Sequence, residues 1–307
     1  MKIAIIGTGG VGGYYGALLA KQGEDVTFVA RGAHLQAIRQ NGLEIKSIHG
    51  DVTIFPAKAT DRLAQIGPVD LVLFCVKAYD TAQFAAETAP LLGEDTTVVS
   101  LQNGVEAAEQ IGQFVGMPRM LGGATWISSA IESPGVIRQV SQFRRVVLGE
   151  LDGSMTPRLQ AVFQAFDKTG ITVEATQDIA RVLWTKFIFI SAASSLGSLT
   201  RLPLGDYRTV PETRSLVIQL MREVESVARA QGVALDPDVV DKSLDFIDQA
   251  APTIRASMQN DIAAGRRSEI EAMIGVIGRK GRAAGVATPV ADMVYAALLP
   301  IEVKARG

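Results

Sequence analysis

The feature that most constrains the fold of this chain is a glycine-rich turn close to its start. A short apolar run, Ile3–Ile6, leads into Gly7-Thr8-Gly9-Gly10-Val11-Gly12, and Tyr14–Gln22 follows with helical spacing. Between a strand and a helix, the first glycine permits a tight turn, the second lets the backbone approach a diphosphate, and the third allows close packing. The alternative is a purely structural turn, but this context favours dinucleotide binding at the helix N-terminus.

Strand-like and helix-like segments alternate through the first half of the chain. Continuous apolar runs are typical of strands that are buried on both faces. The alternation therefore predicts a parallel sheet wrapped by helices. Between about residues 119 and 149 we expect hairpins added to the edge of this sheet. The other expected strands after the first are Val26–Val29, Asp70–Val76, Thr96–Val99 and Ile171–Glu174.

From about residue 178 the pattern is helical almost throughout. Capping boxes, Thr209-x-x-Glu212 and Ser268-x-x-Glu271, are expected to open two of the helices. We therefore predict an α/β protein with two domains. The N-terminal one, residues 1–178, is a Rossmann-type NADP-binding domain, and the C-terminal one, residues 179–307, is all helical and carries the substrate and catalytic residues.

Composition excludes several classes of function. The 30 Lys and Arg residues are balanced by 32 Asp and Glu residues, so no basic surplus points to nucleic acid. One cysteine, Cys75, and two histidines, His34 and His49, argue against a metal site. We find no signal peptide and no apolar run near 18 residues, which predicts a cytoplasmic protein without a membrane span. A homodimer is left open.

Three polar residues follow expected strands, at the edge where such folds bind ligands. Arg31 stands where NAD-binding proteins usually have an acidic residue, and its charge and bidentate geometry favour the 2′-phosphate of NADPH. Lys77 could neutralise cofactor phosphate, and Asn103 could bind nicotinamide or substrate. The alternatives are an arginine on a solvated rim and ordinary polar loop residues. His34, in an expected surface helix, is predicted to be solvated.

Lys186 falls on the apolar stripe of a helix expected over Ile179–Ile190. A lysine there must snorkel outward, pair with an acid or face a cleft. If it is desolvated its pKa falls, and it could donate a proton near neutral pH. Glu269 is expected in the first helical position after Ser268, where the helix dipole favours its ionised form. The alternative for Glu269 is an ordinary glutamate at a helix start.

Together these motifs resemble the ketopantoate reductase (2-dehydropantoate 2-reductase) family along nearly the whole chain. The most specific part is Trp-x-Lys combined with Ser-Met-x-x-Asp and a glutamate eight residues after that aspartate. The matching segments are Lys2–Gly13, Val76–Ala78, Gln102–Gly104, Leu183–Phe187, Ser257–Asp261 and Arg267–Ile270.

The resemblance implies an oxidoreductase that uses NADPH to reduce ketopantoate to pantoate, on the route to pantothenate and coenzyme A. It implies that Lys186 is the general acid and that Glu269 and Ser257 bind substrate. It also implies cofactor contacts at the glycine turn, Arg31, Lys77 and Asn103, the last also near substrate, and loosely at Ser129.

The chain departs from the family pattern where several asparagines are expected. Those positions are Ile190, Ser194, Leu204 and Ile254 here, and we expect Ser194 to contact substrate. Losing amide groups should weaken recognition of a hydroxylated acid, so one alternative is a bulkier, more apolar 2-oxo acid. An alternative from another class is a non-catalytic NADP-binding regulator.

Overall fold

The computed structural model describes residues 1–306, which form two compact units. The first unit consists of Met1–Gln102 and Glu106–Ile179, and the second of Asn103–Val105 and the chain from Ala180 onward. The short piece Asn103–Val105 follows a strand of the first unit but belongs to the second. The assignment of cofactor and substrate roles to the two halves of the chain stays a prediction.

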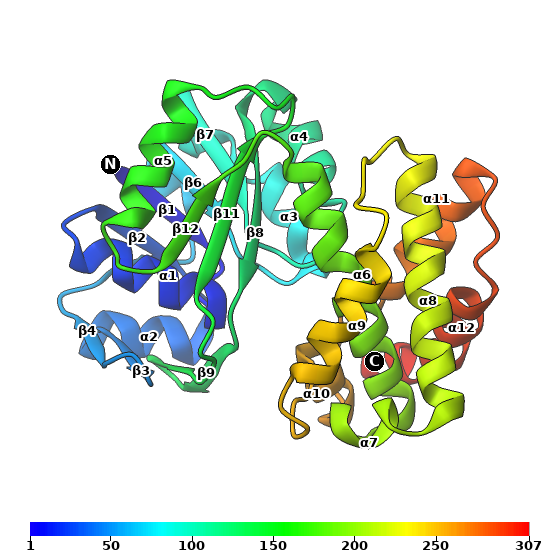
Figure 1. Ribbon diagram of the computed structural model, residues 1–307. Helices are drawn as coiled ribbons and strands as arrows, with labels where there is room; N and C mark the ends of the chain where they lie inside the picture. The colour runs from blue at the N-terminus through cyan, green and yellow to red at the C-terminus, as the bar shows by residue number, and fades with distance from the viewer. Residues whose placement is uncertain (307) are drawn as a thin grey trace. The chain divides into compact units, whose positions relative to one another are not determined.

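The first unit is built on an eight-stranded sheet (Figure 1). Its strand order is β12-β11-β8-β7-β6-β1-β2-β5, and every neighbouring pair is parallel except β8 with β11. The predicted parallel sheet is thus confirmed. The strands are β1 (Lys2–Ile6), β2 (Asp25–Val29), β5 (Lys58–Thr60), β6 (Val69–Phe74), β7 (Leu92–Ser100), β8 (Met120–Trp126), β11 (Arg145–Glu150) and β12 (Thr172–Ala175).

Helices cover both faces of this sheet, which explains why its strands read as continuous apolar runs. Ile3 and Ile5 of β1 join one core cluster with α1 and α5, whereas Ala4 and Ile6 join another with α3 and α4. The helices of this unit are α1 (Gly10–Lys21), α2 (Gly32–Asn41), α3 (Thr81–Ala86), α4 (Ala107–Val115) and α5 (Pro157–Asp167).

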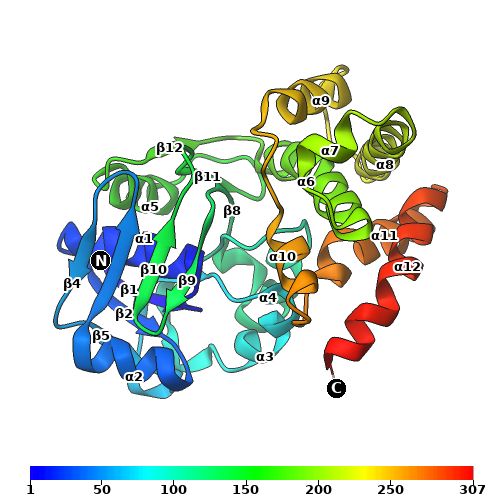
Figure 2. The same cartoon turned by 90° about the horizontal axis from the view of Figure 1, so that it is seen from below.

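A second sheet of four strands, in the order β4-β3-β10-β9, packs against α1 (Figure 2). The expectation that all hairpins between residues 119 and 149 join the main sheet is therefore wrong in part. β8 and β11 do join it, but β9 and β10 pair with each other, and β10 pairs with β3 of the second sheet. β10 and β3 lie far apart in sequence, so local patterning carried no sign of their pairing. The strands are β3 (Leu43–Ser47), β4 (Val52–Ile54), β9 (Ser129–Ser133) and β10 (Val136–Gln139).

The second unit is helical, as predicted. Its core gathers apolar side chains of α6, α8, α9 and α12, among them Phe187, Leu220 and Leu298. A π-helical turn, Glu271–Gly275, precedes α11. The helices are α6 (Ile179–Thr200), whose first residue belongs to the first unit, α7 (Leu204–Arg208), α8 (Pro211–Ala230), α9 (Val239–Gln249), α10 (Ser257–Ala263), α11 (Val276–Ala284) and α12 (Pro289–Arg306).

Within residues 1–306, α6 is the one helix that is long and apolar enough to cross a membrane by length and composition. Of its most apolar window, 61% is buried inside the protein. The core helix of a soluble protein passes the same test, so the length and composition of α6 are a weak indication of a span.

Both expected capping boxes are wrong. The Thr209 hydroxyl donates to the carbonyl oxygens of Gly205 and Asp206, and Val210 occupies the N-cap of α8. The Ser268 hydroxyl donates to the Glu302 carboxylate at 2.6 Å. A hydrogen bond to an ionised carboxylate is stronger than one to a backbone group, which explains why Ser268 does not cap the helix that follows it.

Adjacent glycines of the turn make a matched pair for a stability test. A Cβ added to Gly10 would lie 2.2 Å from the Ser129 carbonyl oxygen, whereas one added to Gly9 would meet no described residue within 4 Å apart from its own neighbours along the chain. We expect Gly10→Ala to lower the free energy of unfolding by about 1–3 kcal/mol or more. Gly9→Ala should lower it by less than about 1 kcal/mol. Urea unfolding measures the free energy of unfolding of both variants. An equal loss in the two variants would contradict the close packing of Ser129 on Gly10.

Candidate active site

The glycine turn lies at the carboxyl edge of the main sheet, directly after β1. Gly7 has a φ of +97°, and a Cβ there would lie 2.6 Å from the Val76 backbone nitrogen. A Cβ on Gly12 would lie 2.2 Å from the Gly7 carbonyl oxygen. The fold itself therefore requires these two glycines. Gly9 is different, because the space beside it is open toward solvent.

The N-terminus of α1 carries features that fit a bound diphosphate. Gly9 is its N-cap, none of the described side chains caps it, and its first turn contains no acidic residue. At the start of β9, where Ser129 packs on Gly10, the buried Ser129 hydroxyl has no hydrogen-bond partner among the described residues. Unpaired N–H groups, a positive helix end and an orphaned hydroxyl suit an anionic dinucleotide.

Arg31 and Lys77 lie at the same edge, because β2 and β6 flank β1. Arg31 is exposed at the N-cap of α2, and its guanidinium carbon lies 4.5 Å from the centre of the Phe84 ring. Lys77 is half-buried after β6, next to Val76, whose carbonyl accepts a hydrogen bond from Gln102. The carboxyl edge of the main sheet thus carries two cationic side chains, and a hydrogen bond from Gln102 holds the backbone next to one of them.

His34 is not solvated, contrary to the expectation from its helix. It is half-buried, the Gly135 N–H donates to its Nδ1 at 3.0 Å, and its Nε2 lies 2.8 Å from the Thr8 carbonyl oxygen. Because Nδ1 accepts, the proton sits on Nε2, which donates to Thr8. Burial lowers the pKa of His34, which favours this neutral form. His34 therefore ties the glycine turn to the turn between β9 and β10.

In the second unit, the predicted proton donor is buried and paired. Lys186 on α6 is 6% exposed, and its Nζ donates to Asn103 Oδ1 at 2.9 Å. Burial lowers the pKa of Lys186 to about 8, while the Glu269 carboxylate acts in the opposite direction. The structure thus brings together Lys186, Asn103 and Glu269, three of the residues singled out from the sequence.

Glu269 stands just before an irregular helix start. Its carbonyl oxygen accepts hydrogen bonds from the backbone nitrogens of Ala272 and Met273, and the helix begins one residue later than expected. The π-helical turn Glu271–Gly275 follows at once. Such turns occur frequently at functional sites, but the sequence pattern alone indicated an ordinary helix.

The positions where asparagines were expected differ in their surroundings. Ser194 is buried on α6, and Ile190 is half-buried one turn from Lys186. Leu204 lies in the core of the second unit, 4% exposed. Ile254 and Ser257, before and at the start of α10, are exposed. Ile190 and Ser194 are therefore the departures that share a helix with the lysine.

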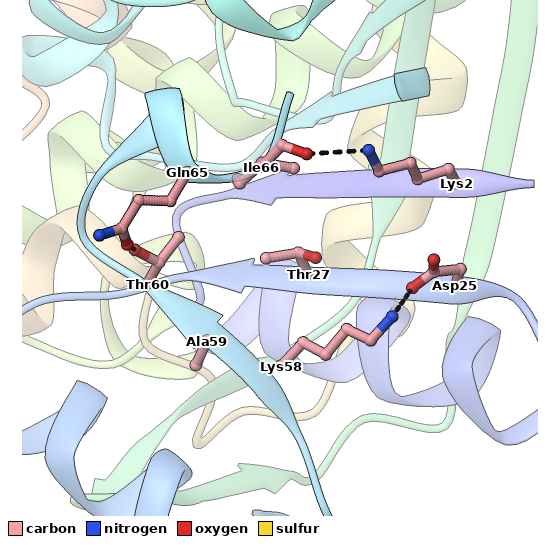
Figure 3. A pocket seen from close by; sticks show the side chains of 8 residues that line it. All are labelled: Lys2, Asp25, Thr27, Lys58, Ala59, Thr60, Gln65 and Ile66. Atoms are coloured by element: carbon pink, nitrogen blue, oxygen red, sulfur yellow. Dashed lines mark hydrogen bonds and ion pairs between the residues drawn. The ribbon is translucent and has the colours of Figure 1, made fainter. Parts of the chain in front are cut away.

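A separate hollow of about 400 Å³ lies in the first unit, on the sheet face beside β5 (Figure 3). Its cations are engaged within it: Lys58 pairs with Asp25 at 2.6 Å, and Lys2 donates to the Ile66 carbonyl oxygen at 2.8 Å. Lys2, Asp25 and Lys58 begin β1, β2 and β5. The hollow thus starts at the opposite edge from the glycine turn and is not part of the candidate site.

Comparison with known proteins decides the family. The model of "Ketopantoate reductase PanE/ApbA" matches residues 3–153, and that of its C-terminal domain matches residues 178–302. The chain belongs to the ketopantoate reductase PanE/ApbA family. The resemblance drawn from the motifs is confirmed, and with it the α/β fold class. The chain is an oxidoreductase acting on CH–OH groups, which stands against the non-catalytic regulator.

Individual relatives span the whole chain. A 2-dehydropantoate 2-reductase of Mesorhizobium japonicum is 30% identical over 317 residues, covering 96% of each protein. The crystal structure of 2-dehydropantoate 2-reductase from Geobacter metallireducens GS-15 is 33% identical, with a TM-score of 0.92 over 98% of this chain and 99% of that one. A ternary structure of D-mandelate dehydrogenase with NADH and anilino(oxo)acetate is 24% identical, with a TM-score of 0.90 over 100% and 99%, and shares the fold.

His34 offers a test in which each of its two contacts is removed separately. Glutamine places an amide nitrogen near the Nε2 position and keeps the bond to Thr8, whereas asparagine places an oxygen near Nδ1 and keeps the bond to Gly135. We expect His34→Ala to weaken dinucleotide binding about 30-fold, as the loss of two hydrogen bonds of about 1 kcal/mol each implies. His34→Gln should recover most of the affinity, and His34→Asn little of it.

Fluorescence titration of the purified variants with NADPH and with NADH measures these affinities. Wild-type affinity in all three variants, or recovery with asparagine and not with glutamine, would show that the bond to Thr8 does not position the glycine turn.

Proposed function

We propose that this protein catalyses the NADPH-dependent reduction of ketopantoate to pantoate, in pantothenate and coenzyme A biosynthesis. The observation that carries the proposal is Lys186, buried, hydrogen-bonded to Asn103 and under the charge of Glu269. Full-length relatives named 2-dehydropantoate 2-reductase support the substrate.

Lys186 acts as the general acid. With a pKa of about 8 it is mostly protonated at neutral pH, yet it releases its proton far more readily than an exposed lysine. Asn103 Oδ1 accepts one of the three ammonium hydrogens. In the reduction, the Lys186 ammonium group stabilises the alkoxide that develops at the substrate carbonyl oxygen and then gives up one proton to it.

The other site residues have separate tasks in the proposal. Glu269 holds part of the proton on Lys186 through its charge and hydrogen-bonds the substrate. Ser194 and Ser257 contact the substrate, and Asn103 uses its amide group toward substrate and nicotinamide.

NADPH fits the residues at the carboxyl edge of the main sheet. When bound, it supplies the hydride for the carbonyl carbon. The glycine turn, from Gly7 to Gly12 with Thr8 and Val11, lies against the diphosphate, which accepts hydrogen bonds from the first N–H groups of α1, and Ser129 adds its unpaired hydroxyl. The Thr8 N–H donates to the Val29 carbonyl oxygen and so fixes the turn. Lys77 neutralises phosphate charge, and Arg31 binds the 2′-phosphate.

A second candidate substrate is a bulkier, more apolar 2-oxo acid. Ile190 favours it, because this apolar side chain lies one turn from Lys186 where the family has an amide. The likeness to D-mandelate dehydrogenase, whose ternary structure holds anilino(oxo)acetate, agrees with this candidate at the level of the fold.

A panel of 2-oxo acids separates the two candidates, with loss of NADPH absorbance as the measurement. We expect the highest kcat/KM for ketopantoate; a higher value for phenylglyoxylate or a branched alkyl acid would favour the second candidate. Ile190→Asn restores the amide of the family pattern, and it should raise the ratio of ketopantoate to phenylglyoxylate turnover. If the protein reduced none of these 2-oxo acids, both candidate substrates would be refuted.

The role of Lys186 has a test in the same assay. Lys186→Ala should lower kcat about 10²–10⁴-fold while leaving NADPH binding intact.

Cofactor choice has its own test at Arg31. Arg31→Ala should weaken NADPH binding about 10–100-fold, the range for a lost hydrogen bond to a charged group, and leave NADH binding nearly unchanged. Arg31→Lys keeps the charge without the bidentate geometry, and its NADPH affinity should lie between those of the wild type and Arg31→Ala. Equal losses for both cofactors would mean that Arg31 does not read the 2′-phosphate.

A further inference from the structure

The carboxylate of Glu302, near the end of α12, is buried and fully engaged. The residue is 1% exposed. Its Oε2 accepts the Ser268 backbone N–H at 2.9 Å and the Ser268 hydroxyl at 2.6 Å, and its Oε1 accepts Arg306 Nε at 2.9 Å. Burial acts to raise the pKa of Glu302, but these hydrogen bonds outweigh it and hold the pKa below its usual value. The residue is therefore an ionised anchor.

The anchor holds the residue directly before Glu269. The helix that follows has no side-chain cap among the described residues, and its first turn is π-helical. α12 holds that turn as well, because the Tyr295 hydroxyl donates to Glu271 at 2.7 Å. α12 thus holds the backbone N–H of Ser268 before Glu269 and the side chain of Glu271 after it.

We propose that Glu302 is a positioning residue for the reaction: through Ser268 it sets the place of the Glu269 carboxylate relative to Lys186. The proposal rests on the proposed function, because it takes Glu269 and Lys186 as the working pair. It adds the end of α12 to the machinery of the site, 34 residues from Ser268 along the chain.

The chain contains a control for mere loss of stability. Glu223 on α8 is half-buried and accepts the backbone N–H groups of Val290 and Ala291, both at 2.8 Å. It therefore anchors the start of α12, whereas Glu302 anchors its end. Glu223→Ala should loosen the same helix without touching Ser268.

Conservative variants separate the hydrogen bonds that hold Ser268 from the negative charge of Glu302. Both bonds from Ser268 reach the same carboxylate oxygen, so Glu302→Gln keeps them when its amide oxygen takes that place. Arg306→Ala keeps both bonds from Ser268 and removes the contact to the other oxygen, together with the ion pair of Arg306 with Glu271 at 3.7 Å. Glu302→Ala removes all three bonds.

The experiment compares kcat, KM and melting temperature of these full-length variants with NADPH and the best 2-oxo acid. We expect Glu302→Ala to lower kcat about 10–100-fold, as a misplaced group near the chemistry does. Glu302→Gln and Arg306→Ala should stay within about threefold of wild type, and Glu223→Ala should lose melting temperature but keep kcat. A wild-type kcat in Glu302→Ala, or an equal kcat loss in Glu223→Ala or Glu302→Gln, would overturn the proposal.

A second readout needs no substrate. Labelling of Lys186 by an amine-reactive reagent, followed against pH by mass spectrometry, reports the influence of Glu269 on the lysine. Glu302→Ala should move the midpoint to lower pH, and Glu223→Ala should not; an unmoved midpoint in Glu302→Ala overturns the proposal. A wild type that reduces no 2-oxo acid refutes the proposed function, whereas a failure confined to the variants refutes the role of Glu302.

Discussion

The hydrogen bond between Lys186 and Asn103 is the interaction on which the account of this protein depends. A lysine among buried apolar side chains of α6 would carry a large desolvation penalty if nothing compensated its charge. Asn103 Oδ1 accepts one of its hydrogens, and Glu269 supplies a negative charge. The compensation is partial, so the ammonium group remains a better proton donor than an exposed lysine. The same partial compensation is what makes the site a candidate for reducing a carbonyl.

The rest of the structure divides between elements that hold this group and elements that prepare an anion site. Gly7 and Gly12 are fixed by close backbone contacts, and the open space beside Gly9 leaves the N-terminus of α1 accessible. His34 and Glu302 both support the backbone of a neighbouring segment. His34 bonds to Thr8 in the glycine turn, and Glu302 bonds to Ser268, the residue before Glu269. Neither touches the proposed reacting atoms, but each sets the backbone next to a residue that would.

Much of the fold could be predicted from the sequence because its cause is local. Runs such as Asp70–Val76 predict strands that are buried on both faces, and the place of Lys186 on an apolar stripe predicts an unusual environment. The pairing of β10 with β3 could not be predicted, because the pattern of one strand does not indicate which distant strand lies beside it. The failures at His34 and Ser268 have the same origin: their partners, Gly135 and Glu302, are 101 and 34 residues away.

The pH dependence of kcat/KM for 2-oxo acid reduction at saturating NADPH tests the central claim most directly. Lys186 must carry the proton that it donates, and its pKa is lowered to about 8. Activity should therefore be full below that pKa and fall as the pH rises through about 8. In the reverse oxidation the dependence should invert. A profile that is flat through this range, or the same limb in Lys186→Ala, would contradict the assignment of Lys186 as the proton donor.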